Sequence, residues 1–379
     1  MKKAAWNNCY LICTEASKIW AIDGWGISTI FIHDEHIAAR AARKSLSGEA
    51  GFLGSRISVV NQAADRVLIV ANPRAGARSR DRAISDLVDC LAARGLTAQI
   101  VTDLSVLAET ADRYHAAGQL RAVVGAGGDG TMAEIVNRTH ADIPVTVYPC
   151  GTANLLANYF QLACEPESMT QTLIEGATVR LDTGKANGRI FLLMVGCGFD
   201  ADVVQQLHRR REGGHISYWT WARPILDSLR SYKYPALRVC FEADPAQNVE
   251  AHVSAARWAF MVNLPCYAGG LEVAPEAVGN DGLLNVCTFG NGSFWHALRY
   301  LGFVALRRHR GLSDFKTTVV KRVRIESDQQ VPYQLDGDPG GFLPLDVEVL
   351  PQRMTLIAPY ARILALGLQA SATSSAGAV

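Results

Sequence analysis

One carboxylate, Asp129, sits among glycines in a Gly-Gly-Asp-Gly-Thr sequence that follows a short apolar run. Gly127, Gly128 and Gly130 would let the backbone adopt positive φ and approach a ligand closely, because no Cβ stands in the way. A helix that opens at Thr131 would present unpaired N–H groups and its positive dipole end to an anion. Asp129 would then hold Mg²⁺ or orient a donor of the loop. The pattern predicts a phosphate loop between a strand and a helix, and a glycine-rich turn without a ligand is the competing interpretation.

A second turn of the same kind follows further along the chain, where Gly-Thr-Ala-Asn comes after another apolar run. Gly151 would again allow a close approach. Thr152 and Asn154 would each either bind a phosphate oxygen or cap the helix that follows. Because ligands of open parallel sheets bind in a crevice at the carboxyl ends of the strands, we expect both turns to face the same ligand.

The elements that must position these turns alternate between strands and helices. Residues 66–71 and 97–101 are predicted to be strands. Apolar side chains recur at helical spacing from Ile84 to Leu91, and residues 104–117 are predicted to be the next helix. This alternation predicts a layered α/β domain with a parallel sheet.

From about residue 179 the chain changes to a series of strands. Residues 179–186 and 190–195 flank an Asn-Gly pair, which is typical of a tight hairpin. Two helices, at 216–234 and 293–310, combine aromatic with basic residues and either cover a sheet or dock on a lipid headgroup layer. Further strands are predicted at 236–242, 257–263, 284–289, 317–327 and 345–350, which indicates a second, mainly antiparallel domain.

The two glycine motifs, together with four others, resemble the diacylglycerol kinase catalytic domain of bacterial lipid kinases and sphingosine kinases. All six occur in the family's order over roughly residues 66–360. The chain lacks the Gly-x-x-x-x-Gly-Lys-Ser/Thr motif, which argues against a P-loop enzyme. The four others are Asn-Pro-Arg-Ala-Gly from Asn72, Gly-Cys-Gly-Phe-Asp-Ala from Gly196, Asn-Asp-Gly-Leu-Leu from Asn280 and Leu-Asp-Gly-Asp from Leu335.

The resemblance implies two domains with the active site in the cleft between them. An α/β nucleotide-binding domain with a parallel sheet is expected at 61–182, completed by 352–369. A mainly antiparallel, β-rich lipid-substrate domain is expected at 183–351. Residues 1–60 are expected to be a poorly ordered extension, and residues 370–379 a disordered tail rich in Ser, Ala and Thr.

The same resemblance implies an ATP-dependent lipid kinase with Mg²⁺ as cofactor. It would transfer the γ-phosphoryl group to a hydroxyl of diacylglycerol or of a related lipid, sphingoid or phosphatidylglycerol-like. Such a transfer needs phosphate cradles, a divalent cation and an aimed acceptor. Two other functions remain open: an NAD kinase-like small-molecule kinase, and a nucleotide-binding protein without transfer activity.

The resemblance also assigns roles to individual side chains. Asp338 would be the base for the acceptor hydroxyl; the family usually has glutamate there, so this carboxylate is shorter by about 1.5 Å, and a misplacement of about 1 Å can cost about a hundredfold in rate. Asp129 would act through Mg²⁺ or water. Asp200 resembles the acidic residue near the acceptor, with Asp202 as the alternative and a helix N-cap as the competing interpretation. The residues expected to bind nucleotide are Asn72, Pro73, Gly76, Thr102, Gly127, Gly128, Asp129, Gly130, Thr131, Glu134, Gly151, Thr152 and Asn154.

A Mg²⁺ site outside the transfer centre is implied at Asp281 with the carbonyl groups of Val278 and Leu283. One carboxylate, backbone oxygens and water suit a hard cation. An ordinary Asn-Asp-Gly turn is the competing interpretation.

Composition excludes several classes of protein. A net charge of +1 with dispersed basic residues argues against a nucleic-acid partner. Nine cysteines without metal-ligand spacing fit a reducing cytosol. The apolar stretch at 20–32 is too short to span a bilayer. We therefore expect a cytoplasmic protein, with peripheral association at the inner face of the membrane left open, whose partners are ATP and a lipid substrate at the membrane surface; a homodimer is also left open.

Overall fold

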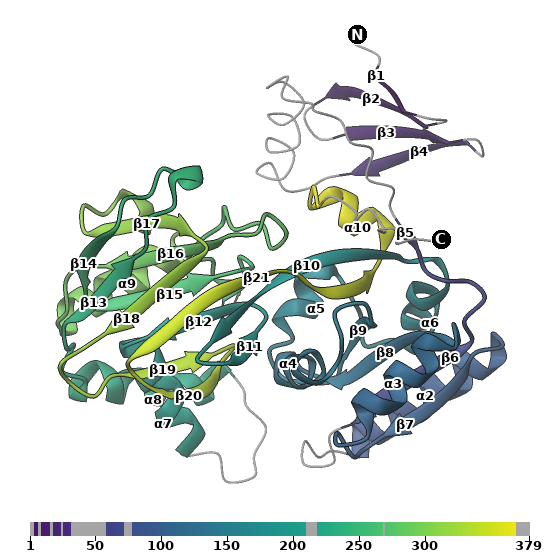
Figure 1. Ribbon diagram of the computed structural model, residues 1–379, viewed down its shortest axis with the longest axis horizontal. Coiled ribbons are helices and arrows are strands. Elements are labelled where there is room, and N and C mark those ends of the chain that lie inside the picture. The colour runs from purple at the N-terminus through teal and green to yellow at the C-terminus, as the bar shows by residue number, and fades with distance from the viewer. Residues whose placement is uncertain are drawn as a thin grey trace, which may run out of the picture.

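A computed structural model describes residues 4–6, 9–15, 18–23, 26–31, 58–71, 78–209, 218–267 and 270–368. These residues form an α/β domain and a β-sandwich that lie side by side and are joined by two long strands (Figure 1). The predicted fold class is confirmed. No helix in the described part of the chain is long and apolar enough to cross a membrane. The predicted tail, 370–379, lies outside the described residues.

The N-terminal residues contain a separate four-stranded antiparallel sheet in chain order. The poor order expected of residues 1–60 stays a prediction. The strands are β1 (Ala4–Trp6), β2 (Cys9–Glu15), β3 (Lys18–Asp23) and β4 (Gly26–Phe31).

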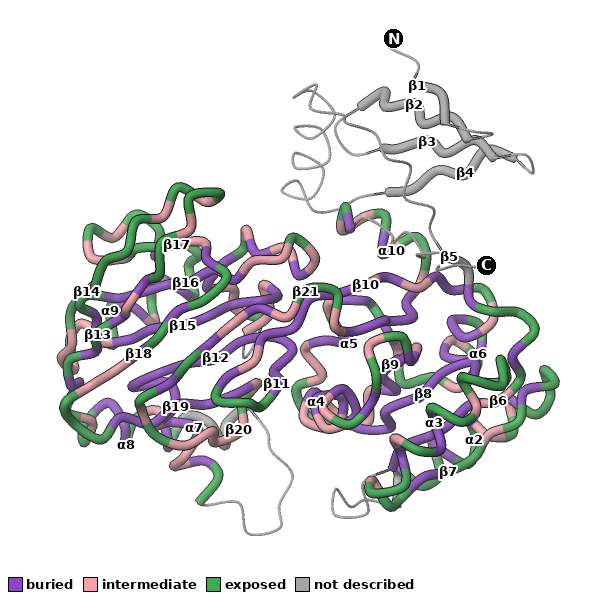
Figure 2. The backbone as a smooth tube through the Cα atoms, in the orientation of Figure 1, coloured by how far each residue is buried: buried purple, intermediate pink, exposed green. Residues whose placement is uncertain are grey.

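The α/β domain is built on four parallel strands in the order β7-β6-β8-β9. Every residue of β8 is buried, as expected for a parallel strand covered on both faces by helices (Figure 2). Both strands predicted at 66–71 and 97–101 are confirmed. The elements are β6 (Arg66–Ala71), α2 (Arg78–Ala93), β7 (Thr97–Val101), α3 (Leu107–Ala116), β8 (Leu120–Gly127), α4 (Asp129–Arg138), β9 (Pro144–Pro149), α5 (Leu155–Phe160) and α6 (Pro166–Glu175).

Two long antiparallel strands, β10 (Ala177–Ala186) and β21 (Leu345–Ala358), run through both domains. The last part of β21 pairs in parallel with β9 and so returns the chain to the first domain, where α10 (Tyr360–Ala365) follows. The first part pairs with β18 (Arg322–Glu326) of the sandwich. Together with β5 (Ser58–Val59), these pairings make one eleven-stranded sheet.

The predicted domain boundary at Asp182 is an irregularity in β10 rather than a free linker. The register of β10 against β21 shifts between Leu181 and Thr183. The buried carboxylate of Asp182 accepts hydrogen bonds from the N–H groups of Gln352 at 2.7 Å and Gly282 at 2.6 Å. Both connecting strands are therefore pinned at the level where the domains meet.

The sandwich packs a six-stranded antiparallel sheet, in the order β17-β16-β15-β12-β19-β20, against the outer strands of the large sheet. An apolar core lies between the two sheets (Figure 2). Besides β10, β18 and β21, the elements of the sandwich domain are β11 (Arg189–Phe191), β12 (Met194–Cys197), α7 (Phe199–Arg209), α8 (Tyr218–Ser231), β13 (Leu237–Phe241), β14 (His252–Ala256), β15 (Trp258–Val262), β16 (Leu284–Phe289), α9 (Phe294–Ala305), β17 (Phe315–Val320), β19 (Pro332–Leu335) and β20 (Asp338–Phe342).

Two predicted strands are each two strands in different sheets. The stretch 190–195 divides into β11 and β12, because the chain bends at Leu192 and Leu193, whose N–H groups bind a side chain rather than a neighbouring strand. The stretch 317–327 divides at Lys321 into β17 and β18. The apolar run continues through the break at Leu192 and Leu193 and gave no sign of the change of sheet, whereas two consecutive charged residues, Lys321 and Arg322, mark the second break. The helix predicted at 293–310 also ends early, at Ala305.

Candidate active site

The two glycine turns lie directly against each other at the carboxyl ends of β8 and β9. A Cβ added to Gly151 would lie 2.6 Å from the Cα of Gly128, and one added to Gly127 would lie 2.2 Å from Oγ1 of Thr131. A side chain at Gly151 would therefore force the two turns apart, and one at Gly127 would displace Thr131 within the first motif. The predicted meeting of the two motifs is confirmed by this contact.

The predicted reason for the glycines is wrong in one respect. None of Gly127, Gly128 and Gly130 has a positive φ. The extended backbone at Gly128 leads straight from β8 into α4, which begins at Asp129 rather than at Thr131. The glycines are required because little space is left beside them: Gly128 packs on the backbone of Gly151, and Gly127 and Gly130 face the side chains of Thr131 and Asp338.

Asp129 ties the second turn to the first. Its buried carboxylate accepts hydrogen bonds at 2.9 Å from the N–H groups of both Leu155 and Leu156, the first residues of α5. Burial raises the pKa of this carboxyl, while the N–H donors oppose the rise and the negative charge of Asp338 adds to it. Both carboxylate oxygens are thus engaged by the first turn of α5, and the two roles predicted for Asp129 stay predictions.

Asn154 shapes its own turn instead of capping the helix. It occupies the N-cap position of α5 in the left-handed conformation, but its side chain makes no capping bond. Its Oδ1 accepts from the N–H of Gly151 at 3.1 Å, and its Nδ2 donates to the carbonyl oxygens of Gly151 and Pro149. Thr152 is exposed on the same turn. The carboxylate of Asp129 does the capping that the sequence had suggested for Asn154 or Thr152.

A tight turn from the second domain reaches the glycine loops. Asp336 and Gly337, between β19 and β20, both have positive φ. The Asp336 carboxylate accepts from the N–H groups of Leu192 at 2.7 Å, Leu193 at 2.8 Å and Met194 at 2.9 Å. Asp336 is thus fully engaged in holding the turn on the junction between β11 and β12, and it is not placed to act as a base.

The titration of Asp336 yields a prediction for stability. Burial raises the pKa of the Asp336 carboxyl from 3.8 to about 6, and its three N–H bonds limit the rise. A carboxyl whose pKa is raised on folding binds protons more readily in the folded chain, so its contribution to stability falls as the pH rises from about 4 to about 6. Urea unfolding across this range should show a steeper decline for the native chain than for Asp336→Asn. If the free energy of unfolding changed with pH equally in both proteins, the raised pKa of Asp336 would be contradicted.

Asp338 is the carboxylate that meets the glycine loop. Its Oδ2 lies 3.1 Å from the position that a Cβ on Gly130 would occupy, beside the first turn of α4. The second domain therefore places a carboxylate at the amino end of α4, and no described protein group donates a hydrogen bond to it.

A buried chain of polar side chains holds the turn of Asp338 in place. The carboxylate of Asp200 accepts from the hydroxyl of Tyr267 and, at 2.9 Å, from Nε2 of Gln334. Oε1 of Gln334 in turn accepts from the N–H of Gly337 at 2.7 Å. Burial raises the pKa of Asp200, although both donors oppose the rise. Asp200 is therefore connected to the turn of Asp338 through Gln334.

The alternatives for Asp200 can now be compared. The helix α7 begins at Phe199, so Asp200 lies within its first turn and is not the N-cap. Asp202 turns toward α8, where it accepts from the hydroxyl of Ser228 at 2.7 Å. Sequence reasoning missed Tyr267 and Gln334; a glutamine in an otherwise apolar strand was the available signal.

The residues predicted to bind Mg²⁺ form a turn that contains oxygen atoms suitable as metal ligands. Oδ1 of Asp281 accepts from the N–H of Leu283 at 3.1 Å, and the carbonyl oxygen of Val278 accepts from the N–H of Asn280. The exposed carboxylate and carbonyl oxygens fit a hard cation that keeps water ligands. No group of three or more His, Cys, Asp or Glu side chains among the described residues could hold a metal ion. The Mg²⁺ site stays a prediction that depends on carbonyl groups and water.

The remaining predicted nucleotide residues have different surroundings. Thr102 is exposed just beyond β7, at the same edge of the sheet as the glycine turns. Glu134 forms ion pairs with Arg138 and, at 3.6 Å, with Arg189. The members of the first motif, Asn72, Pro73 and Gly76, lie outside the described residues.

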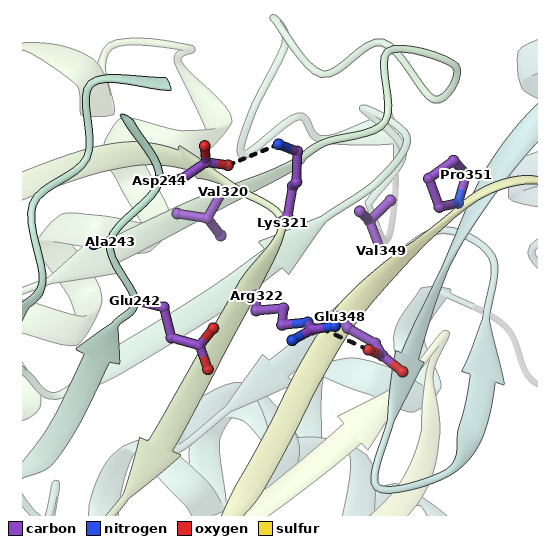
Figure 3. A pocket seen from close by; sticks show the side chains of 9 residues that line it. All are labelled: Glu242, Ala243, Asp244, Val320, Lys321, Arg322, Glu348, Val349 and Pro351. Carbon is purple, nitrogen blue, oxygen red and sulfur yellow. Dashed lines mark ion pairs between the residues drawn. The ribbon is translucent and has the colours of Figure 1, made fainter. Parts of the chain in front are cut away.

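A hollow in the sandwich, with a volume of about 350 Å³, contains none of these residues (Figure 3). Its two cationic side chains are paired: Lys321 with Asp244 at 3.0 Å, and Arg322 with Glu348 at 3.6 Å. It offers no unpaired cation to a phosphate group and is separate from the candidate active site.

Comparison with known proteins matches both domains in turn. Residues 66–186 match the model of the diacylglycerol kinase catalytic domain, and residues 193–358 match the YegS C-terminal NAD kinase beta sandwich-like domain. The chain belongs to the diacylglycerol kinase catalytic domain family. Its family members include a diacylglycerol kinase of Mycobacterium tuberculosis, 27% identical over 246 residues that cover 63% of this chain and 77% of the relative.

Two further members of the diacylglycerol kinase family extend the comparison. A diacylglycerol kinase of Bacillus subtilis is 24% identical over 302 residues, which cover 78% of this chain and 96% of the relative. A crystal structure of a diacylglycerol kinase from Bacillus anthracis matches the fold with a TM-score of 0.54 at 17% identity, covering 78% of this chain and 97% of that one. The two-domain fold is thus shared by members of the family.

Proposed function

We propose that this family member is an ATP-dependent lipid kinase that phosphorylates a hydroxyl of diacylglycerol or of a related lipid. The observation that carries the proposal is the approach of Asp338, from the second domain, to Gly130 at the amino end of α4. At this contact the glycine turns would bind the phosphate groups, and Asp338 would be the base for the acceptor hydroxyl. The names of the relatives support a lipid as the acceptor.

The phosphate groups would bind at the two glycine turns. The amino end of α4 is the positive end of a helix dipole, which stabilises negative charge. Gly128 and Gly151 bring the second turn against the first, and Asp129 keeps it there through Leu155 and Leu156. Because both turns are held before the nucleotide arrives, little rearrangement opposes binding.

The transfer step needs a proton acceptor at the lipid hydroxyl. Asp338 would take that proton as the hydroxyl oxygen bonds to the γ-phosphorus and the bond from that phosphorus to the oxygen of the departing ADP breaks. Gln334 keeps Asp338 aimed, since its Oε1 accepts from the N–H of the adjacent Gly337, and Asp200 holds Gln334 in place by accepting from its Nε2. Val278, Asp281 and Leu283 would hold Mg²⁺ outside the transfer centre. Its positive charge would favour the form of the protein that has the negatively charged phosphate groups bound.

Phosphate transfer from labelled ATP tests the proposal directly. Purified protein with Mg²⁺ is expected to label diacylglycerol, or a sphingoid or phosphatidylglycerol-like lipid, presented in mixed micelles. NAD⁺ serves as the soluble acceptor control. Label in NADP⁺ alone would overturn the lipid assignment in favour of a small-molecule kinase, and ATP binding without any labelled product would overturn the transfer activity itself.

A further inference from the structure

The helix α9 of the sandwich carries an exposed apolar face. Trp295 is 73% exposed, Leu306 just beyond the helix is 68% exposed, and Leu298 between them is 47% exposed. Their spacing of three and eight residues places them on one side of the helix, with Phe303 at its border. Four large apolar side chains exposed along α9 and its C-cap are not a scattering of isolated residues, and such a face marks an interaction site.

The opposite side of α9 already provides its attachment to the domain. Ala297, Tyr300 and Val304 are buried, and the ring of Tyr300 packs 4.6 Å from Phe289 and 5.6 Å from Trp258 of the six-stranded sheet. The helix is therefore fixed without help from Trp295 or Leu306. The exposed face is surplus to the needs of folding.

The segment that carries this face has charged residues of one sign only. Residues 294–311 contain four arginines and no acidic residue. Arg307 and Arg310 pair with Glu272 and Glu276, but the arginines are 59% and 54% exposed whereas their partners are only 32% and 29% exposed. The guanidinium groups are thus the outermost charges, and Arg308 is exposed without an ion pair within the described part of the chain.

We propose that α9 and residues 306–311 dock on an anionic lipid surface, an inference that rests on the proposed lipid kinase activity. Trp295, Leu298 and Leu306 would enter the boundary between headgroups and acyl chains, and the arginines would contact lipid phosphates. A second copy of this chain fits less well, because a two-fold interface would bring each arginine-rich segment against its own copy.

Vesicle flotation of the full chain without ATP tests the docking apart from catalysis. The native chain is expected to bind vesicles of equimolar phosphatidylglycerol and phosphatidylcholine more tightly than vesicles of pure phosphatidylcholine. The double variant Trp295→Ser, Leu306→Ser should bind the anionic vesicles at least about tenfold more weakly, because the buried apolar area is lost. Arg308→Glu should weaken binding to the anionic vesicles alone.

A matched control removes an equally exposed apolar side chain elsewhere. Val253 is 62% exposed on β14, in the other sheet of the sandwich, and Val253→Ser should bind vesicles like the native chain. Thermal unfolding of each variant verifies that α9 is still folded. Transfer to a water-soluble short-chain diacylglycerol should be unchanged in the double variant, so failure of docking and failure of the kinase assignment are distinguishable. Unchanged vesicle binding by the folded double variant would overturn the proposal. It would also be overturned if light scattering showed that the native chain is a dimer and that the double variant alone is a monomer.

Discussion

Replacing Asp338 with asparagine is expected to lower the rate of phosphoryl transfer by at least about a hundredfold, as for the loss of a positioned base. The amide keeps the size of the side chain but cannot take the hydroxyl proton. The structure leaves this role to Asp338 because Asp336 is engaged by three N–H groups and Asp200 by Tyr267 and Gln334. Initial rates with saturating ATP and lipid measure the effect, and a fully active variant would show that the base lies elsewhere.

Two further substitutions sharpen this prediction. Asp338→Glu should preserve or raise the rate, since it restores the usual reach of the family's carboxylate. Gly130→Ala would place a Cβ 3.1 Å from Oδ2 of Asp338, so the carboxylate must move and the rate should fall by about tenfold. Gly290→Ala is the matched control, because a Cβ there meets its nearest neighbour at an ordinary 3.5 Å.

Replacing Asp129 with alanine is expected to abolish turnover and to weaken ATP binding more than lipid binding. The change leaves the N–H groups of Leu155 and Leu156 without their acceptor, so the second glycine turn loses its attachment to α4. Leaving buried donors unpaired should also lower the free energy of unfolding by about 1–3 kcal/mol. ATP titration, steady-state kinetics and urea unfolding measure the three effects.

Asp202→Ala provides the comparison for Asp129→Ala. It also removes an aspartate that accepts hydrogen bonds in the first turn of a helix, but those bonds come from Ser228 and Gln206, outside the active site. It should lose stability while keeping its affinity for ATP. Near-normal turnover by Asp129→Ala would remove this carboxylate from the mechanism.

Local patterns predicted the elements of the α/β domain well. The strands β6 and β7 and the hairpin at Asn187 and Gly188 agree with the prediction, since apolar runs and an Asn-Gly pair specify them within a few residues. The break at Leu192 was missed because the strands on either side of it continue the same apolar pattern, and the break at Lys321 was missed although two charged residues stand there. A change of sheet depends on distant partners, here the carboxylate of Asp336, which leave no local signal.

The sequence by itself determined which residue types were available for chemistry and in what order they occur. The glycine motifs identified two phosphate-compatible turns, and the Leu-Asp-Gly-Asp motif supplied the second domain's carboxylates. Only the tertiary structure decided their division of labour: Asp129 and Asp336 hold backbone N–H groups, whereas Asp338 faces Gly130. The physical reason is that a carboxylate's role depends on the donors around it, and these donors come from residues far away in the chain.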